Sequence, residues 1–390
     1  MKKYTFLFLL SLLLILSCST EVELNAPYKS TTVVFGLLDP DANEDGITNQ
    51  LDTQWIKINR TFLGDENNLD YALIRDSSEY KEEDFTKKVV QIITNGNVSS
   101  EFELISKNVS NKSVNGIFYG PEQTLYYFIP PSNGLNQESE YKLLLEFKEK
   151  ESVEATSNIT KTNQLNFQIP QPTTTITMAT TTAGGNVNFS SSVQMKWQAA
   201  ENVGIYTATL RFHYVEKTYD NPQWMGAPIS IENKFVDFVL GTYNPTDTET
   251  PAGTPISLTF SGQSFFTFLG NKIQANPTIR REIGFFDGSK TRCFDAIVTM
   301  GNEELSTYIA VNSPATGIVQ ERPVYSNIAN GLGLFGSRST KKIKDLSLTS
   351  TGGGGGIQIG NLVALVRSEQ TADLNFCDPN PTSDDEFRCN

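Results

Sequence analysis

The sequence predicts an all-β protein of two β-sandwich (Ig-like) domains, with one short amphipathic helix in the second. Short apolar runs rich in β-branched and aromatic residues recur along the chain, and several alternate apolar with polar positions. Turn-forming segments such as NGN and PPSNG separate these runs. Charged residues make up only 19% of the chain and aromatic residues 11%, which is typical of exported β-rich proteins with large cores.

Composition divides the chain into five segments. A stretch rich in Thr, Pro and Gly, residues 168–185, separates two regions that each show strand patterns. We therefore predict a lipoprotein signal peptide over residues 1–17, a lipidated tether over 18–30, an N-terminal β-sandwich domain over 31–168, a C-terminal β-sandwich domain over 169–366 and a polar, Cys-containing tail over 367–390.

The N-terminus has the features of an export signal that ends in a lipidated cysteine. Lys2 and Lys3 precede an apolar run, residues 6–16, that is too short to span a bilayer comfortably. Ser17 and Cys18 follow, and this ending resembles the lipobox of bacterial lipoproteins, whose cysteine is acylated. Each buried methylene of a chain such as palmitate contributes roughly 0.8 kcal/mol, so acylation at Cys18 predicts a stable anchor. An ordinary signal peptide with an incidental cysteine is the alternative.

Two acidic residues follow the predicted anchor. Glu21 and Glu23 lie in a polar tether, where a plain solvated linker is one interpretation. In Bacteroidota, acidic residues at such positions resemble the signal that sends lipoproteins to the outer face of the outer membrane. On that interpretation the protein is lipid-anchored in the outer membrane and faces the cell surface.

The predicted N-terminal domain contains six strand candidates. Within residues 54–62, Ile56 and Ile58 fall on one face and Trp55 and Lys57 on the other, which is the period of a half-buried strand. The segment 65–80 fits either a short helix or a loop. The six candidates cover residues 31–38, 54–62, 88–94, 101–106, 124–130 and 140–147.

The predicted C-terminal domain combines further strands with the one helix. In residues 204–217, alternate positions from Tyr206 to Tyr214 are apolar and predict a core-facing row. The helix is predicted over 264–277, because Ser264 can cap it and Pro277 can end it. The strand candidates cover residues 193–198, 204–217, 229–243, 256–260, 293–301 and 305–311.

Charge and hydropathy limit the partners of this chain. The formal net charge is -13, which disfavours nucleic acid or anionic lipid as a partner, because both would repel the protein. Apart from the N-terminal run, no apolar stretch reaches the eighteen residues of a membrane-spanning helix.

Three cysteines remain besides Cys18. Cys377 and Cys389 are closest in sequence, and a disulfide between them would fix the C-terminal tail. A bridge between Cys293 and Cys377 is the alternative. None of the spacings suggests zinc.

The best ligand motif is the segment DANEDGITNQLD, residues 41–52. Its oxygen-bearing side chains follow the spacing of a twelve-residue calcium loop, and a glycine permits the sharp turn that such a loop needs. The candidate ligands of a structural Ca²⁺ are Asp41, Asn43, Asp45, Asn49 and Asp52. Because the segment joins two strands rather than two helices, an exposed acidic hairpin loop is the alternative.

The sequence predicts no catalytic residue. His213 is the only histidine, which excludes two-histidine metal sites, and an exposed strand position explains it. Nucleophile-elbow, zinc-protease and nucleotide-binding motifs are missing from the sequence. Trp224 and Met225 form an apolar pair in a Pro-containing loop, which suits a contact with a protein partner.

Three segments resemble a set of Bacteroidota outer-membrane lipoproteins built on a β-sandwich domain of unknown function. They are VVFGLLDP, QWIKINRTFLG and PVYSNIANGLGLFGSRST, and the cysteine with its tether supports the resemblance. The resemblance covers about residues 24–366 and implies a surface location and work alongside an outer-membrane β-barrel. It carries over no catalytic residue.

We therefore expect a non-enzymatic surface lipoprotein that acts as an accessory or structural subunit docked on an outer-membrane β-barrel complex, in barrel assembly, secretion or TonB-dependent transport. The alternative is a lipoprotein that captures a glycan or another nutrient for a TonB-dependent transporter. A hydrolase that uses carboxylates is a third reading, although no motif supports it.

Overall fold

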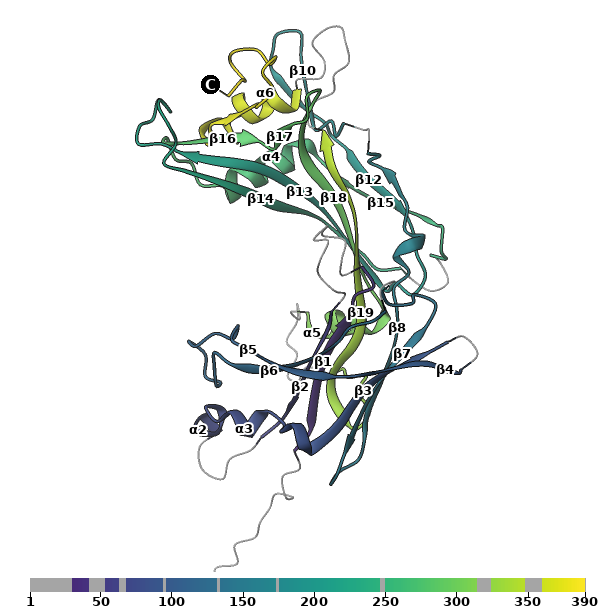
Figure 1. The fold of residues 1–390 in the computed structure, drawn as a ribbon. Helices are drawn as coiled ribbons and strands as arrows, with labels where there is room; N and C mark the ends of the chain where they lie inside the picture. The colour runs from purple at the N-terminus through teal and green to yellow at the C-terminus, as the bar shows by residue number, and fades with distance from the viewer. Residues whose placement is uncertain are drawn as a thin grey trace, which may run out of the picture.

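The computed structural model describes residues 30–41, 53–62, 68–93, 96–131, 134–172, 175–245, 250–313, 324–347 and 360–389. The described chain is mostly β-structure in open sheets with few helices, which confirms the predicted fold class. Figure 1 shows two lobes in a crescent. The N-terminal lobe contains β1 to β8, the C-terminal lobe contains β9 to β18 and β20, and β19 runs through both.

The strands of the N-terminal lobe are β1 Thr32–Leu38, β2 Gln54–Arg60, β3 Phe85–Ile92, β4 Val98–Glu103, β5 Ile105–Val109, β6 Gln123–Phe128, β7 Glu140–Phe147 and β8 Val153–Asn158. Those of the C-terminal lobe are β9 Phe167–Ile169, β10 Ala179–Thr181, β11 Val187–Phe189, β12 Val193–Gln198, β13 Ile205–Thr218, β14 Ser230–Tyr243, β15 Pro255–Phe260, β16 Ile279–Ile283, β17 Phe285–Phe286, β18 Thr291–Gly301 and β20 Phe376–Cys377. The shared strand is β19 Gly331–Ser347. The helices are α2 Asn68–Ala72, α3 Arg75–Ser78, α4 Gly262–Lys272, α5 Glu303–Asn312 and α6 Gly360–Arg367, with 3-10 turns at Glu82–Asp84, Thr162–Gln164 and Ala372–Leu374.

One 11-stranded sheet passes through both lobes. Its main order is β20-β16-β13-β18-β19-β1-β2-β6-β5, with β14 beside β13 and β17 beside β18. The first part of β19 pairs in parallel with the whole of β1, and the rest pairs antiparallel with β18. The lobes are therefore joined by a shared strand as well as by the connecting chain.

A smaller sheet packs against each half of the large one. The sheet β4-β3-β7-β8 completes the N-terminal sandwich, and β15-β12-β9 covers the C-terminal half together with α4 and α6. Side chains that alternate along each strand fill two separate cores. The N-terminal core includes Val34, Leu38, Ile56, Ile58, Tyr126, Phe128, Leu143 and Phe335. The C-terminal core includes Trp197, Tyr206, Ala208, Leu210, Phe212, Phe265, Phe294 and Leu362.

The predicted helix is present as α4, with different ends. Ser261 rather than Ser264 is the N-cap, and its Oγ accepts a hydrogen bond from the Ser264 backbone N–H at 3.1 Å. The helix stops at Lys272, before Pro277. Ser261 has the extended backbone of an N-cap, which places Ser264 inside the first turn.

The prediction of one helix in the C-terminal domain was incomplete. Residues 305–311, predicted as a strand, belong to α5, because Asn302 caps this segment and Glu303 and Glu304 favour the N-terminus of a helix. The apolar helix α6 was not predicted. Within the segment 65–80, the described residues form the short helices α2 and α3.

The prediction of a polar tail over 367–390 was wrong for its middle part. Leu374, Phe376 and Phe387 are at most 5% exposed and belong to the C-terminal core. β20 pairs in parallel with β16, and Cys377 forms a disulfide with Cys389 across a Cα–Cα distance of 5.0 Å. The strand pairing and the disulfide together hold this segment against the C-terminal lobe. The few apolar residues of an otherwise polar segment are therefore buried in the core.

Polar side chains that are nearly all buried join the lobes next to β19. The Asn302 Nδ2 donates hydrogen bonds to the Ser157 Oγ at 2.9 Å and to the Asn158 carbonyl at 3.1 Å. The Thr160 and Ser339 hydroxyls lie 2.6 Å apart. Each group is satisfied only while the lobes keep this arrangement, so the junction is specific rather than a flexible hinge.

We predict that Asn302→Ala lowers the free energy of unfolding by about 2–3 kcal/mol, because it removes a helix cap and leaves buried partners without hydrogen bonds. Urea denaturation measures the change. Asn312→Ala, at the exposed end of the same helix, is the matched control and should change stability by less than about 0.5 kcal/mol. Equal effects of the two substitutions would contradict this account of the junction.

Candidate binding surface

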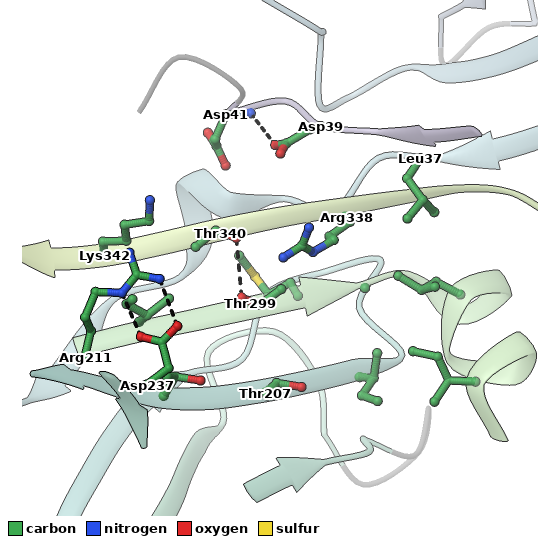
Figure 2. A pocket seen from close by; sticks show the side chains of 17 residues that line it. Leu37, Asp39, Asp41, Thr207, Arg211, Asp237, Thr299, Arg338, Thr340 and Lys342 are labelled. Carbon is green, nitrogen blue, oxygen red and sulfur yellow. Dashed lines mark hydrogen bonds and ion pairs between the residues drawn. The ribbon is translucent and has the colours of Figure 1, made fainter. Parts of the chain in front are cut away.

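One side of the large sheet faces away from both cores, and we call it the open face. On β13 the side chains of Thr207 and Arg211 lie between the buried positions and point to this side. On β19 the side chains of Arg338 and Lys342 do the same. β18 lies between these two strands, so the four side chains share one surface (Figure 2).

The open face is hollowed where the two lobes meet. The hollow has a volume of about 640 Å³ and is open to solvent. Thr207, Thr299 and Thr340 contribute hydroxyls from three neighbouring strands, and the last two lie 3.4 Å apart. Leu305 and Ile309 of α5 form an apolar wall, and Figure 2 shows that helix at one end of the hollow. The arrangement therefore combines hydroxyl groups with an apolar side.

A charged pair is fixed in this hollow by two hydrogen bonds. The Arg211 Nε lies 2.7 Å from the Asp237 Oδ1, and the second guanidinium bond to Oδ2 measures 2.9 Å. The same guanidinium carbon lies 4.0 Å from the centre of the Phe235 ring. Two parallel hydrogen bonds and a stacked ring hold the Arg211 side chain in one orientation.

Arg338 differs from Arg211 in its surroundings. Its exposed side chain forms no hydrogen bond or ion pair with any residue that the structure describes. It lies across the hollow from Asp39 and Asp41, which enter from the end of β1 (Figure 2). A guanidinium in this setting can bind a carboxylate or phosphate group through a bidentate contact.

A second hollow of about 460 Å³ continues the open face and shares Arg211 and Lys342 with the first. Here the His213 Nε2 lies 2.8 Å from the Asp295 Oδ2. Burial raises the pKa of Asp295, but the hydrogen bonds from His213 and from the Asp345 backbone N–H outweigh it, so the pKa lies below its usual range. The histidine thus stabilises a carboxylate.

The Cys293 thiol, which lies near His213 and Asp295, does not form a nucleophilic site with them. Cys293 lines the same hollow, but it is buried, and burial raises the pKa of its thiol well above the usual range. A thiol in this environment stays protonated and a poor nucleophile. The geometry around His213 therefore fits a structural hydrogen bond and a polar surface.

The candidate calcium ligands are mostly outside the described residues. Asp41 lines the hollow, and its backbone N–H donates to the Asp39 carboxylate at 3.0 Å. Asn43, Asp45, Asn49 and Asp52 lie in the segment 42–52, which is not described. In the described parts of the chain, no cluster of three or more His, Cys, Asp or Glu residues could hold a metal ion.

The lipidation candidate, Cys18, also lies outside the described residues. None of the helices that the structure describes has the length and apolarity needed to cross a bilayer. The described chain begins at residue 30, two residues before β1.

Trp224 and Met225 lie in the loop between β13 and β14 and differ from each other. The Trp224 Nε1 donates to the Pro277 carbonyl at 3.0 Å, and the Arg280 guanidinium carbon lies 4.4 Å from the ring centre. Met225 is 67% exposed. Only Met225 presents most of its apolar side chain to solvent, while Trp224 fixes the loop against the neighbouring turn.

The predictions from the sequence did not include the row formed by Arg338, Thr340 and Lys342. These residues occupy alternate positions of β19 and therefore project on one side. The alternation is visible in the segment SRSTKKIKD, but its pairing with β18 and β1 is not. Polar residues at every second position of a strand candidate are the signal that would have identified them.

The protein has no match among known families or curated proteins: no family model fits the sequence, and none of the curated proteins is similar to it.

We predict that Asp295→Asn lowers the free energy of unfolding at pH 7 by about 1.5–3 kcal/mol, because it removes a charged hydrogen-bond acceptor. A carboxylate whose pKa falls on folding stabilises the protein above its unfolded pKa, which is about 3.8, and loses this effect at lower pH. The difference from wild type should therefore narrow below that pH. Urea titrations at pH 7 and pH 3 test this, with the exposed Asp373→Asn as control. A difference that does not change with pH would contradict the assignment.

Proposed function

We propose that this chain is a non-enzymatic, surface-exposed outer-membrane lipoprotein that acts as an accessory or structural subunit docked on an outer-membrane β-barrel complex. The observation that carries the proposal is the open face itself. It extends over both lobes and is hollowed broadly instead of closing into a deep pocket. A surface of this shape fits a macromolecule better than a small substrate.

Exposed apolar side chains on the open face support a protein partner. In the N-terminal lobe they include Phe35 at 43%, Trp55 at 39% and Ile105 at 53% exposure. In the C-terminal lobe they include Phe235 at 53% and Val239 at 56%. Exposed apolar side chains mixed with arginine and polar side chains are typical of protein interfaces.

The predicted acylation explains how such a surface could be used. Twelve residues, 19–30, connect Cys18 to the body, and an extended chain of this length spans at most about 40 Å. The anchor therefore confines the body close to the membrane and raises its effective concentration near a barrel in the same membrane. The proposal assigns no cofactor to this role, and a structural Ca²⁺ at residues 41–52 remains a prediction.

Capture of a glycan or another nutrient for a TonB-dependent transporter is the second candidate. The observation that favours it is an aromatic pair on β2 and β6, where the Trp55 and Tyr127 ring centres lie 5.1 Å apart. The Lys107 ammonium lies 5.7 Å from the Trp55 ring centre. Sugars stack on exposed aromatic rings and accept hydrogen bonds from such neighbours.

The anchor is tested by Cys18→Ser in the full chain. We expect the wild-type protein to fractionate with the outer membrane and the variant to leave the membrane fraction, because the fatty chains supply the membrane affinity. Mass spectrometry of the N-terminal peptide reports the modification directly. A wild-type N-terminus that carries an unmodified amine would refute the lipoprotein assignment.

Docking is tested by Arg338→Glu on the open face. Solubilisation in mild detergent should recover the wild-type protein with a stoichiometric barrel partner. The amount of partner recovered with the variant should be at least about tenfold lower, because a charged contact at an interface contributes about 2 kcal/mol or more to binding. Lys148→Glu makes the same change of charge at an exposed turn and should keep the partner. Recovery of the wild-type protein alone, with bound oligosaccharide, would favour capture instead.

A further inference from the structure

β14 is an unusually long and open edge of the large sheet. It has 14 residues, and among the described residues it pairs only with β13. Other edge strands are shorter: β4 and β8 have 6 residues each, β5 has 5, and β15 has 6 and begins at Pro255. Residues 230–239 of β14 contain no proline and no register shift. An edge of this kind invites pairing with another strand.

The direction of the free backbone groups follows from one hydrogen bond. The His213 carbonyl of β13 accepts from the Gly284 N–H at 3.0 Å, on the side away from β14. Alternate residues of a strand direct their backbone groups to opposite sides, so Tyr214 bonds toward β14, where it lies opposite Lys234. The backbone groups of Phe235 and of every second residue from it therefore point outward from the edge.

These outward residues also carry their side chains on the open face. They are Ile231, Asn233, Phe235, Asp237 and Val239, and the three apolar ones are 61%, 53% and 56% exposed. Their chemical types read the same in both directions from the central phenylalanine: apolar, polar, aromatic, polar, apolar. A strand with this pattern is complementary to an antiparallel copy of itself.

We infer that β14 pairs antiparallel with β14 of a second copy of this chain, with the two Phe235 residues facing each other at the two-fold axis. Ile231 then lies opposite the second copy's Val239, and Asn233 lies opposite its Asp237. A shift of the second strand by two residues in either direction would place Phe235 opposite Asn233 or Asp237, which are polar. Only the register centred on Phe235 pairs all five residues of the row and matches apolar with apolar and polar with polar.

A second copy fits this edge better than an unrelated strand for two reasons. Asn233 can donate to the Asp237 carboxylate, whose charge Arg211 already compensates at 2.7 Å. In addition, a two-fold symmetric contact pairs the β14 edge of both copies and leaves neither of these edges free. It therefore gives a closed dimer and no fibre. This inference concerns the sheet edge and does not rest on docking to a barrel.

The register is tested by a charge swap in the full-length protein, with sedimentation velocity in detergent as the readout. Ile231→Glu and Val239→Lys each place a charge opposite an apolar residue at two symmetric positions, and we expect each to raise the dimer dissociation constant by about tenfold. The double variant I231E/V239K places opposite charges together and should recover most of the affinity. Val98→Glu, an equally exposed residue of β4, is the control and should leave the dimer intact.

Cysteine cross-linking in intact membranes provides an independent measurement. Hydrogen-bonded antiparallel neighbours have Cα atoms about 5.5 Å apart, within the range of a disulfide. Phe235→Cys should therefore form a cross-linked species of twice the chain mass on oxidation, while the similarly exposed Phe285→Cys should not. A wild-type monomer at every concentration, single variants that dimerise normally, or a cross-link from Phe235→Cys only to a different protein would each overturn the inference.

Discussion

The parallel pairing of β1 with the first part of β19 is the contact on which the rest of the structure depends. It joins residues almost 300 positions apart, as in the bond from the Ser337 Oγ to the Leu38 carbonyl, where the separation is 299. Gly333 makes this approach feasible: its φ is +115°, and a Cβ there would lie 1.9 Å from the Val34 carbonyl oxygen. Without this strand pair, the N-terminal core would lose Phe335 and the lobes would lose their common sheet.

The register of β19 also decides which residues lie on the open face and which hold the fold together. Ser337 and Ser339 point into the buried junction, and Arg338 lies between them on the open face. A slip of one residue would exchange these two sets and bury the guanidinium. Burying the unpaired charge of Arg338 would cost free energy, so this slip is unfavourable. The same cost therefore keeps the serines in the polar junction and the arginine on the open face.

Local patterns in the sequence predicted the local structure, and contacts distant in the chain were beyond them. The alternation in β13 predicted its buried row correctly, because a period of two is visible within ten residues. The sequence does indicate the start of α5, because Asn302 is followed by two glutamates. The segment was nevertheless predicted as a strand because of its apolar residues. The placement of the polar row of β19 and the burial of Phe376 depend on strands far away in the chain, and no local pattern in the sequence indicates those strands.

The open face and the edge of β14 present different groups of one sheet. Side chains of the open face project perpendicular to the sheet, whereas the free backbone groups of β14 lie in its plane. Phe235 belongs to both, because its ring stacks under Arg211 while its backbone points outward. Pairing at the edge would therefore extend the open face across two copies instead of covering it. Two linked surfaces bind a symmetric or extended partner more strongly than either surface alone.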